Sequence, residues 1–476
     1  MEDIKNVTAL EEQTIKRISS RIIPFLIILF IMAFLDRTNI GFAALHMNDA
    51  IGITQTIFGL GAGVFFLGYF IAEVPSNVLL HRFGARIWIA RIMITWGIIA
   101  GLMGFIHSGT QFIILRFLLG IAEAGFFPGV IFYLTLWFPA KYRARVFATF
   151  YLGLPIAQII GAPISVGLMQ WGNTIGYEGW RLMYILEGIP SIILGLVCLK
   201  YLTNNPKEAQ WLTAEQRQWL MNTLEREERE KEQSADAALT KGELIKQVFK
   251  NPLVWIMAIV YFGITSGSNA MFFFLPSVLE SFRNTFGMQI SLIQNGLLTA
   301  IPYAFAAVGM VLWSRRSDRK QERYKHGACA ALMAAFAIAI ALIVNQPWAI
   351  IVGFILLAIG VFSAINIFWT IPGQTLTGVG AAAGIGLINS VGNLSGFTGP
   401  YLTGYLYTTT GTYTVAFLAI AGFVAMGGLG LLLLAKLKSD SLKVEQQRLK
   451  VRTATEMKYW LGLVLLERAL WECQWP

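Results

Sequence analysis

Twelve long apolar runs are the feature that most limits what this chain can fold into. They lie at about 22–45, 56–80, 86–107, 111–138, 144–171, 180–202, 252–280, 291–314, 326–345, 348–372, 380–406 and 412–435. A helix needs about 20 apolar residues to cross the hydrocarbon core of a bilayer. The chain is therefore predicted to be an all-α membrane protein with twelve transmembrane helices.

The composition agrees with this prediction. Hydrophobic residues make up 56% of the chain and charged residues only 13%, whereas a soluble domain has about 25% charged residues. These values exclude a soluble globular domain, a disordered chain and a collagen-like chain. The three cysteines, Cys198, Cys329 and Cys473, have no CxxC spacing. They predict neither a disulfide framework nor a zinc site.

The spacing of the runs predicts two six-helix halves. We expect a cytoplasmic N-terminal segment (1–21), a first bundle (22–202), a charged cytoplasmic linker (203–250), a second bundle (251–436) and a cytoplasmic tail (437–476). Opposite charges alternate in the linker, which is typical of a solvated helix. The first run is too long for the apolar core of a signal peptide, so it is expected to be an uncleaved anchor.

The net charge of +10 could suggest nucleic-acid binding, but the positions of the charges argue against it. Lys and Arg gather in the loops at 81–86, 141–145 and 315–320 and near both ends of the chain. The opposite loops, near 46–55, 107–110, 345–347 and 407–411, contain none. This bias predicts that both termini are cytoplasmic. The expected macromolecular surroundings are the lipid bilayer, with no nucleic-acid partner.

The two halves repeat some of their helix-breaking residues. Phe127-Pro128-Gly129 in the fourth run corresponds to Ile371-Pro372-Gly373 in the tenth, and Gly161-Ala162-Pro163 in the fifth to Gly399-Pro400 in the eleventh. Such a repeat favours a transporter with its site at the midplane between two halves. Gly and Pro are also common in membrane helices in general, which is the alternative explanation.

Ionisable residues inside apolar runs are expensive, so each is a functional hypothesis. The first half holds Asp36, Arg37, Glu73, Arg116, Glu123 and Glu187. A guanidinium is a planar fork that suits a carboxylate. We therefore expect Arg37 and Arg116 to select an anion, and Asp36 and Glu123 to balance those charges and carry protons.

Each of these residues also has a structural explanation. Asp36 and Arg37 could form a salt bridge near a helix end, and Glu73 and Glu187 could tie helices together. Arg116 could extend to the outer surface. Its seven-residue spacing from Glu123 is two helical turns, about 10 Å, so the two share a face.

The second half is different, because residues 327–435 include no Asp, Glu, Lys or Arg. It offers neutral polar side chains instead: Asn269, Asn366, Trp369, Thr370, Gln374, Asn389 and Asn393. We expect charge and proton handling in the first half, and hydrogen bonds with an aromatic wall from the second. Packing is the alternative role for Trp369.

Several motifs are similar to those of one family. They are LDRTNIGFA (35–43), EVPSN (73–77), RFGARIWIAR (82–91), RFLLGIAEAGFFPG (116–129), LWFPAKYRAR (136–145), LEGIPS (186–191), WSRRSDRKQER (313–323), FWTIPGQ (368–374) and GLINSVGNLSGFTGPYLTGYL (386–406). From about residue 15 to 436 the chain resembles the anion:cation symporter family of the major facilitator superfamily. That family includes bacterial permeases for sugar acids, tartrate-like hydroxy acids and hydroxyphenylacetate.

The resemblance implies proton-coupled alternating access. It assigns proton coupling to Asp36 and Glu123 and substrate contact to Arg37 and Arg116. It further implies a cavity lined by Tyr69, Gln158, Asn366, Trp369, Asn389 and Asn393. Gating or structural roles fall on Glu73, Arg82, Gly84, Arg86, Asp318 and Arg319.

Two departures from the family pattern stand out. His81 occupies the place of the usual loop aspartate before Arg82, which puts the gating ion pair on that side in doubt. The tail beyond about residue 440 is also unlike the family, and its apolar part is too short to span. An interfacial segment, a disordered segment and a translation artefact all remain open for it.

The leading functional prediction is a secondary transporter that imports a small organic anion, a sugar acid or a hydroxycarboxylate, with protons. The alternatives are a proton-coupled exporter of drugs or metabolites, and a membrane sensor that does not transport. There is no P-loop, HExxH or GxSxG motif, so we expect no enzyme, cofactor or metal. By resemblance we expect a monomer in the cell (inner or plasma) membrane. Which acid is carried stays open.

Overall fold

The computed structural model describes residues 2–234, 249–372 and 379–440, and within these ranges it contains helices and no strand. The helices are α1 (Glu2–Ala50), α2 (Gln55–Phe83), α3 (Ala85–Leu102), α4 (Gly109–Glu123), α5 (Phe126–Trp137), α6 (Ala140–Tyr151), α7 (Gly153–Thr174), α8 (Gly179–Tyr201), α9 (Ala214–Ser234), α11 (Pro252–Phe286), α12 (Leu292–Lys320), α13 (Arg323–Val344), α14 (Pro347–Phe368), α16 (Val379–Asn393), α17 (Ser395–Thr410) and a last helix, Tyr413–Asp440. The predictions for Gln374 and for the tail beyond residue 440 fall outside the described residues.

The predicted all-α membrane fold is confirmed. Eleven helical segments in the described ranges are long and apolar enough to cross a membrane. Two of them are interrupted, since α4 and α5 together form Gly109–Trp137, and α6 and α7 form Ala140–Thr174. The run predicted at 380–406 appears as α16 and α17, which have 15 and 16 residues.

The interruption between α16 and α17 has a local cause. Leu394 donates its N–H to the carbonyl of Val391, three residues back, so the regular ladder is lost there. Gly392 and Gly396 flank the break and lie against the rings of Tyr261 and Phe66, where a Cβ would approach ring carbons to 2.0 and 2.4 Å. Close packing against these aromatic rings therefore requires glycine at both positions. Glycine has a low helix propensity, so the same residues destabilise the helix at this point.

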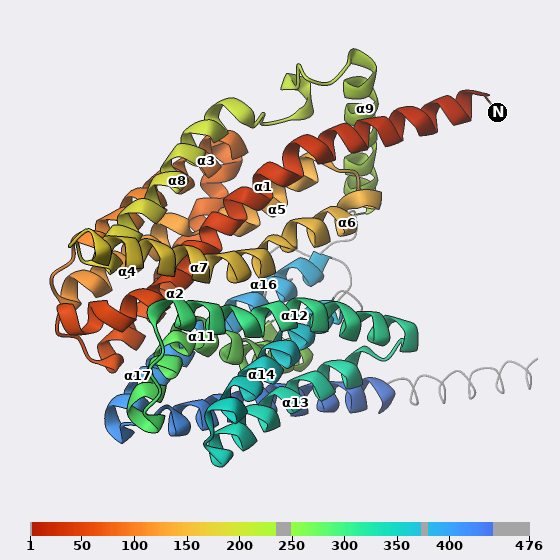
Figure 1. Ribbon diagram of the computed structural model, residues 1–476. Helices are drawn as coiled ribbons and strands as arrows, with labels where there is room; N and C mark the ends of the chain where they lie inside the picture. Colours follow the sequence, from red (N-terminus) through yellow and green to blue (C-terminus); the bar gives the residue numbers. More distant parts are fainter. Residues whose placement is uncertain (1, 235–248, 373–378, 441–476) are drawn as a thin grey trace, which may run out of the picture.

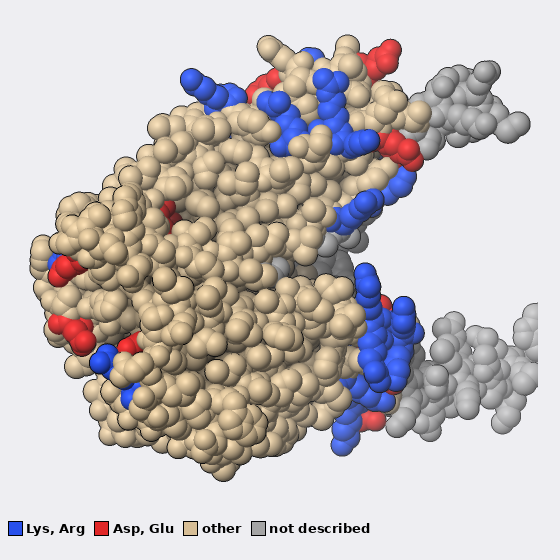
Figure 2. Space-filling model, in the orientation of Figure 1, with Lys and Arg blue, Asp and Glu red and all other residues tan. Residues whose placement is uncertain are grey.

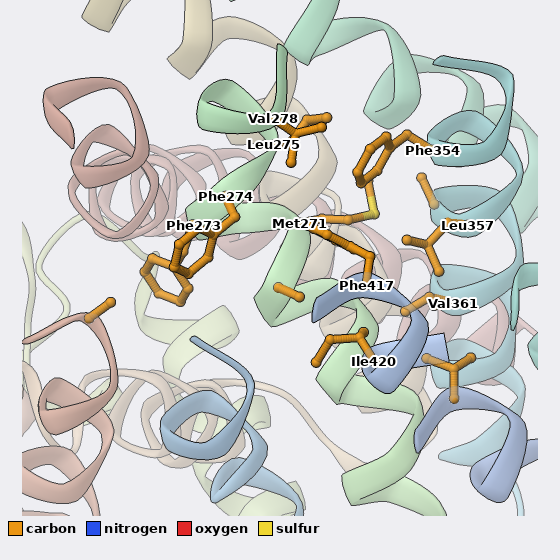
Figure 3. Packing of buried hydrophobic residues seen from close by; sticks show 14 of the residues in the cluster. Met271, Phe273, Phe274, Leu275, Val278, Phe354, Leu357, Val361, Phe417 and Ile420 are labelled. Carbon is orange, nitrogen blue, oxygen red and sulfur yellow. The ribbon is translucent and has the colours of Figure 1, made fainter. Parts of the chain in front are cut away.

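The spanning helices form two bundles. Figure 1 shows α1 to α8 on one side and α11 to the last helix on the other. In the first, α3 packs against α8 and α2 against α4; in the second, α13 and α12 pack against α14. Figure 3 shows part of the second core, where Met271 of α11 lies beside Phe354 of α14 and Phe417 of the last helix.

The bundles touch most closely at one end, where α2 meets α17. A Cβ on Gly59 would lie 2.3 Å from the carbonyl oxygen of Pro400, and one on Gly404 would lie 2.0 Å from that of Gln55. The N–H of Thr56 donates to Thr408 Oγ1 at 3.1 Å. The α7–α12 and α1–α11 contacts complete this closed end.

At the opposite end the bundles diverge. Figure 2 shows the hollow between them, with Lys and Arg gathered on both of its rims. The structure is therefore open at the Lys/Arg-rich end and closed at the other.

The described part of the linker docks on the first bundle. Trp211 stacks on Trp137, with ring centroids 5.3 Å apart, and Leu220 of α9 is fully buried. Glu227 of α9 pairs with Arg143 at 3.0 Å. Within 203–250 the described residues form an α-helix at Ala214–Ser234, and one of its faces is packed rather than solvated.

Candidate binding cavity

A cavity of about 220 Å³ lies between the two bundles, and α1, α2, α4, α5, α6, α7, α11, α12, α14 and α16 contribute to its wall. This volume admits a small solute and excludes a macromolecule. Ten of the polar, ionisable or aromatic residues singled out from the sequence line it: Arg37, Tyr69, Glu73, Glu123, Gln158, Asn269, Asn366, Trp369, Asn389 and Asn393.

The central polar feature is an ion pair between Arg37 and Glu123. Arg37 Nε donates to Glu123 Oε1 at 2.7 Å, and Nη2 lies 2.5 Å from the same oxygen. The Arg37 side chain is 22% exposed, whereas that of Glu123 is 1% exposed. Both bonds use one carboxylate oxygen, and Arg37 Nη1 makes neither of them. Part of the guanidinium fork is therefore open to the cavity.

Aromatic rings hold the Arg37 guanidinium in place. Its Cζ lies 5.1 Å from the ring centre of Phe34, 5.3 Å from that of Phe65 and 5.4 Å from that of Tyr69. Contact with ring faces favours a cation and limits its hydration. The guanidinium is thus presented in a fixed orientation, which favours selective binding of an anion.

Glu123 is placed by the end of α4. The chain turns at Gly125, whose φ of 86° suits glycine. A Cβ there would also lie 2.3 Å from Ser76 Oγ. The short interruption between α4 and α5 therefore directs Glu123 toward Arg37 on α1.

Neutral groups form the rest of the polar wall. Asn366 Nδ2 donates to Ser314 Oγ at 2.8 Å, and Asn269 Nδ2 donates to Ser395 Oγ at 2.9 Å. Gln158 Nε2 is buried and has no hydrogen-bond partner among the described residues. An unsatisfied buried donor in a cavity wall is suited to a ligand oxygen.

Sequence reasoning missed several aromatic residues of the wall. Tyr151, Tyr261 and Tyr303 line the cavity. Tyr261 stacks on Phe368 with ring centroids 5.2 Å apart, and its centroid lies 4.8 Å from that of Trp369. No local pattern distinguishes these tyrosines from packing residues, because their neighbours come from different helices.

Asp36 does not line the cavity, although it precedes Arg37. It is 3% exposed, and its Oδ2 accepts from Trp96 Nε1 at 2.6 Å and from Ser191 Oγ at 3.3 Å. Its Oδ1 has no hydrogen-bond partner among the described residues. Adjacent helical residues point about 100° apart, so one faces the cavity and the other the interior of the bundle.

Arg116 is also placed behind the wall. It is 1% exposed, and its guanidinium donates to the carbonyls of Gly61 and Ala62 at 3.3 and 3.5 Å. It lies over the ring of Phe65, 4.9 Å from its centre, and so shares that ring with Arg37. The structure shows neither an extension to the surface nor direct access to the cavity.

Glu187 has the structural surroundings considered for it. It is 4% exposed and accepts hydrogen bonds from Asn39 Nδ2 at 2.6 Å and Ser165 Oγ at 2.7 Å. These contacts link α8 to α1 and α7. In the described ranges, no group of three or more His, Cys, Asp or Glu side chains is arranged to hold a metal ion.

The residues assigned to gating, apart from Glu73, lie at or between helix ends. Gly84 ends α2 with a φ of 83°, and the N–H of Arg86 donates to Asn204 Oδ1 at 3.0 Å. Arg82 lies over the ring of Phe83. Asp318 and Arg319 lie in the last turn of α12, and Asp318 forms an ion pair with Arg323, the first residue of α13, at 2.9 Å.

Comparisons with known proteins agree with this architecture. The model of the Major Facilitator Superfamily matches residues 26–397. A protein named "Putative tartrate transporter" from Agrobacterium vitis is 43% identical over 427 residues, which cover 90% of this chain and 92% of that protein. A quinolone resistance transporter from Acinetobacter baumannii is 38% identical over 408 residues, 84% of this chain and 90% of that protein.

One solved structure illustrates the shared fold. A bacterial homolog of the human lysosomal transporter Spinster, in an inward-facing and occupied conformation, superposes with a TM-score of 0.69. The alignment covers 88% of this chain and 97% of that one at 16% identity.

Proposed function

The chain belongs to the Major Facilitator Superfamily and is a multi-pass membrane transporter rather than an enzyme, and from this premise we propose that it imports a small organic anion together with protons. The substrate class is a sugar acid or a hydroxycarboxylate. The 43% identical relative whose name refers to tartrate supports this class.

The Arg37–Glu123 pair in the cavity wall is the observation that carries the proposal. A substrate carboxylate that binds the open side of the Arg37 fork competes with Glu123 for the same cation. Glu123 is 1% exposed, and a buried carboxylate that loses its partner is strongly destabilised. Protonation of Glu123 removes that cost, so anion binding and proton uptake favour each other.

We assign a second proton to Asp36. It lies next to Arg37 in sequence, is buried and has no cation partner among the residues described. Its Oδ2 is held by Trp96 and Ser191. If both carboxyls load, a monoanion enters with one net positive charge. One pH unit then supplies about 1.4 kcal/mol per proton, and 100 mV adds about 2.3 kcal/mol per net charge.

The two ends of the cavity suit alternating access between two six-helix units. The open end carries Lys and Arg on both rims, and the closed end is sealed by α2 and α17. By the positive-inside rule the open end faces the cytoplasm. In this proposal both termini are cytoplasmic, and the protein lies in the cell membrane.

Proton influx into proteoliposomes is the direct test. We would impose an inward proton gradient and add aldonates, tartrates, glucarate, hydroxyphenylacetate or phthalate in turn, with internal pH as the readout. Acid-dependent proton entry is expected with one class of acid. An ionophore control shows that the internal pH of the vesicles can respond. If no acid of the panel causes proton entry into vesicles that pass this control, the proposal is contradicted.

Export is the second candidate, because the quinolone resistance transporter is 38% identical to this chain. The same vesicles separate the two functions. An exporter uses the inward proton gradient to drive a drug out of the vesicle lumen, whereas the importer accumulates an acid inside. Movement of a quinolone against its gradient, with no response to any acid, favours export.

A further inference from the structure

The charged side chains of the cavity wall are few. Among the described residues that line it, Arg37, Glu73 and Glu123 are the Asp, Glu, Lys and Arg side chains. The described residues that the second bundle contributes to the wall include no Asp, Glu, Lys or Arg. The wall therefore offers one cation, and Glu123 already neutralises it.

Glu73 is the unpaired member of this set. It makes no hydrogen bond or ion pair with any described residue. It follows Tyr69 on α2 by four residues, about 6 Å along the axis, and the Tyr69 ring lies 5.4 Å from Arg37 Cζ.

The direction of α2 places Glu73 on the access route. The helix begins at the closed end, where Thr56 meets Thr408, and ends at the Lys/Arg-rich end with Arg82. Glu73 therefore lies beyond Tyr69 on the side of the opening. A solute that reaches Arg37 from that side passes this carboxylate.

We infer that the cavity selects a monocarboxylate with a hydroxylated chain, and that Glu73 disfavours a second carboxylate. This inference rests on the proposed function. One substrate carboxylate takes the Arg37 fork. A second one finds no cation among the described wall residues and meets the negative charge of Glu73.

The remaining wall suits hydroxyl groups. Gln158 Nε2 is an unsatisfied donor, and Asn389 and Asn393 of α16 also line the cavity. Neutral amides bind hydroxyls well, because each supplies both a donor and an acceptor. They compensate poorly for a second full negative charge in a site of low dielectric constant.

The size of the discrimination follows from Coulomb's law. Any two like charges within about 10 Å of each other, at an effective dielectric constant near 20, repel enough to weaken binding by at least about tenfold. A dicarboxylate such as tartrate would then bind as its singly protonated form. Lower external pH should therefore reduce the difference in affinity between the dicarboxylate and the matching monocarboxylate.

Matched pairs of acids test the inference, because each pair differs only in the end carbon: gluconate with glucarate, galactonate with galactarate, and threonate with tartrate. We would measure binding to the purified full-length protein by calorimetry and proton influx in vesicles. In each pair that binds, the monocarboxylate should bind at least about tenfold more tightly than the dicarboxylate.

Glu73→Gln removes the charge and keeps the shape, so it should shrink this ratio several-fold. The ratio of the two affinities remains informative even if the variant binds more weakly, because a general loss of affinity affects both acids alike. Glu225→Gln, on the exposed surface of α9, is the matched control and should keep the wild-type ratio. Equal or tighter binding of the dicarboxylates, an unchanged ratio in Glu73→Gln, or no binding of any acid overturns the inference.

The two readouts separate the inference from the proposed function. Preferential binding of monocarboxylates without proton influx supports the selectivity and contradicts the symport. Proton influx with both members of each pair at similar affinity supports the symport and contradicts the selectivity.

Discussion

The two bundles differ in the kind of polarity they bury. The first holds Asp36, Arg116, Glu123 and Glu187 at 4% exposure or less, together with the partly exposed Arg37. The second buries amides and hydroxyls such as Asn269, Asn295 and Thr403. A buried charge responds to protons and to substrate charge, whereas a buried amide responds to neither. In the proposed mechanism, this asymmetry assigns energy coupling to the first half and recognition of neutral groups to the second.

The largest expected effect comes from removing the cation of the first bundle. Arg37→Gln should lower transport by at least about 100-fold, because a charge-assisted pair with the substrate carboxylate is lost. Initial uptake rates in vesicles measure this. Arg229→Gln, a change on the exposed surface of α9, should retain wild-type rates. Near-normal uptake by the Arg37→Gln variant would contradict anion binding by the first bundle through Arg37.

Glu123→Gln should separate binding from coupling. The neutral amide mimics the protonated carboxyl, so exchange of labelled for unlabelled substrate should continue, and its dependence on pH should weaken because only the proton assigned to Asp36 remains. Accumulation driven by a proton gradient should fall and should lose its dependence on voltage, because one proton rather than two enters with each monoanion. The two assays on the same vesicles give the result. Accumulation at the wild-type level, with the wild-type dependence on voltage, would assign coupling elsewhere.

Gly59→Ala tests the contact between the bundles. The added Cβ would meet the Pro400 carbonyl at 2.3 Å, and overpacking costs about 1–3 kcal/mol. The closed end should open about tenfold more often, which hydrogen–deuterium exchange in α2 and α17 detects. Gly167→Ala, where a Cβ has no neighbour within 4 Å, should leave exchange unchanged. Equal exchange in both variants contradicts a seal at Gly59.

The smallest expected effect lies in the second bundle. Asn393→Ala removes one neutral side chain of the cavity wall. Loss of a neutral hydrogen bond costs about 0.5–1.5 kcal/mol, so KM should rise roughly 2- to 10-fold. The number of protons moved per substrate should not change. A changed proton-to-substrate ratio would show that the second bundle takes part in coupling.

Much of the fold could be predicted from the sequence. The lengths of the apolar runs were enough to locate the membrane spans, because lipid excludes a charged segment whatever the geometry of its side chains. The split of the 380–406 run into α16 and α17 could not be predicted, since it depends on where Tyr261 and Phe66 press against Gly392 and Gly396. Nor could the docking of α9, which depends on Leu220 finding an apolar surface on the first bundle.

The sequence by itself determined which residue types each half could contribute: ionisable groups in the first and neutral amides in residues 327–435 of the second. Only the tertiary structure decided which of them share a space. Arg37 and Glu123 meet in the cavity wall, while Asp36 and Arg116 lie behind it. Helical periodicity fixes the angle between neighbouring side chains. Packing of the other helices fixes which of those directions faces the cavity.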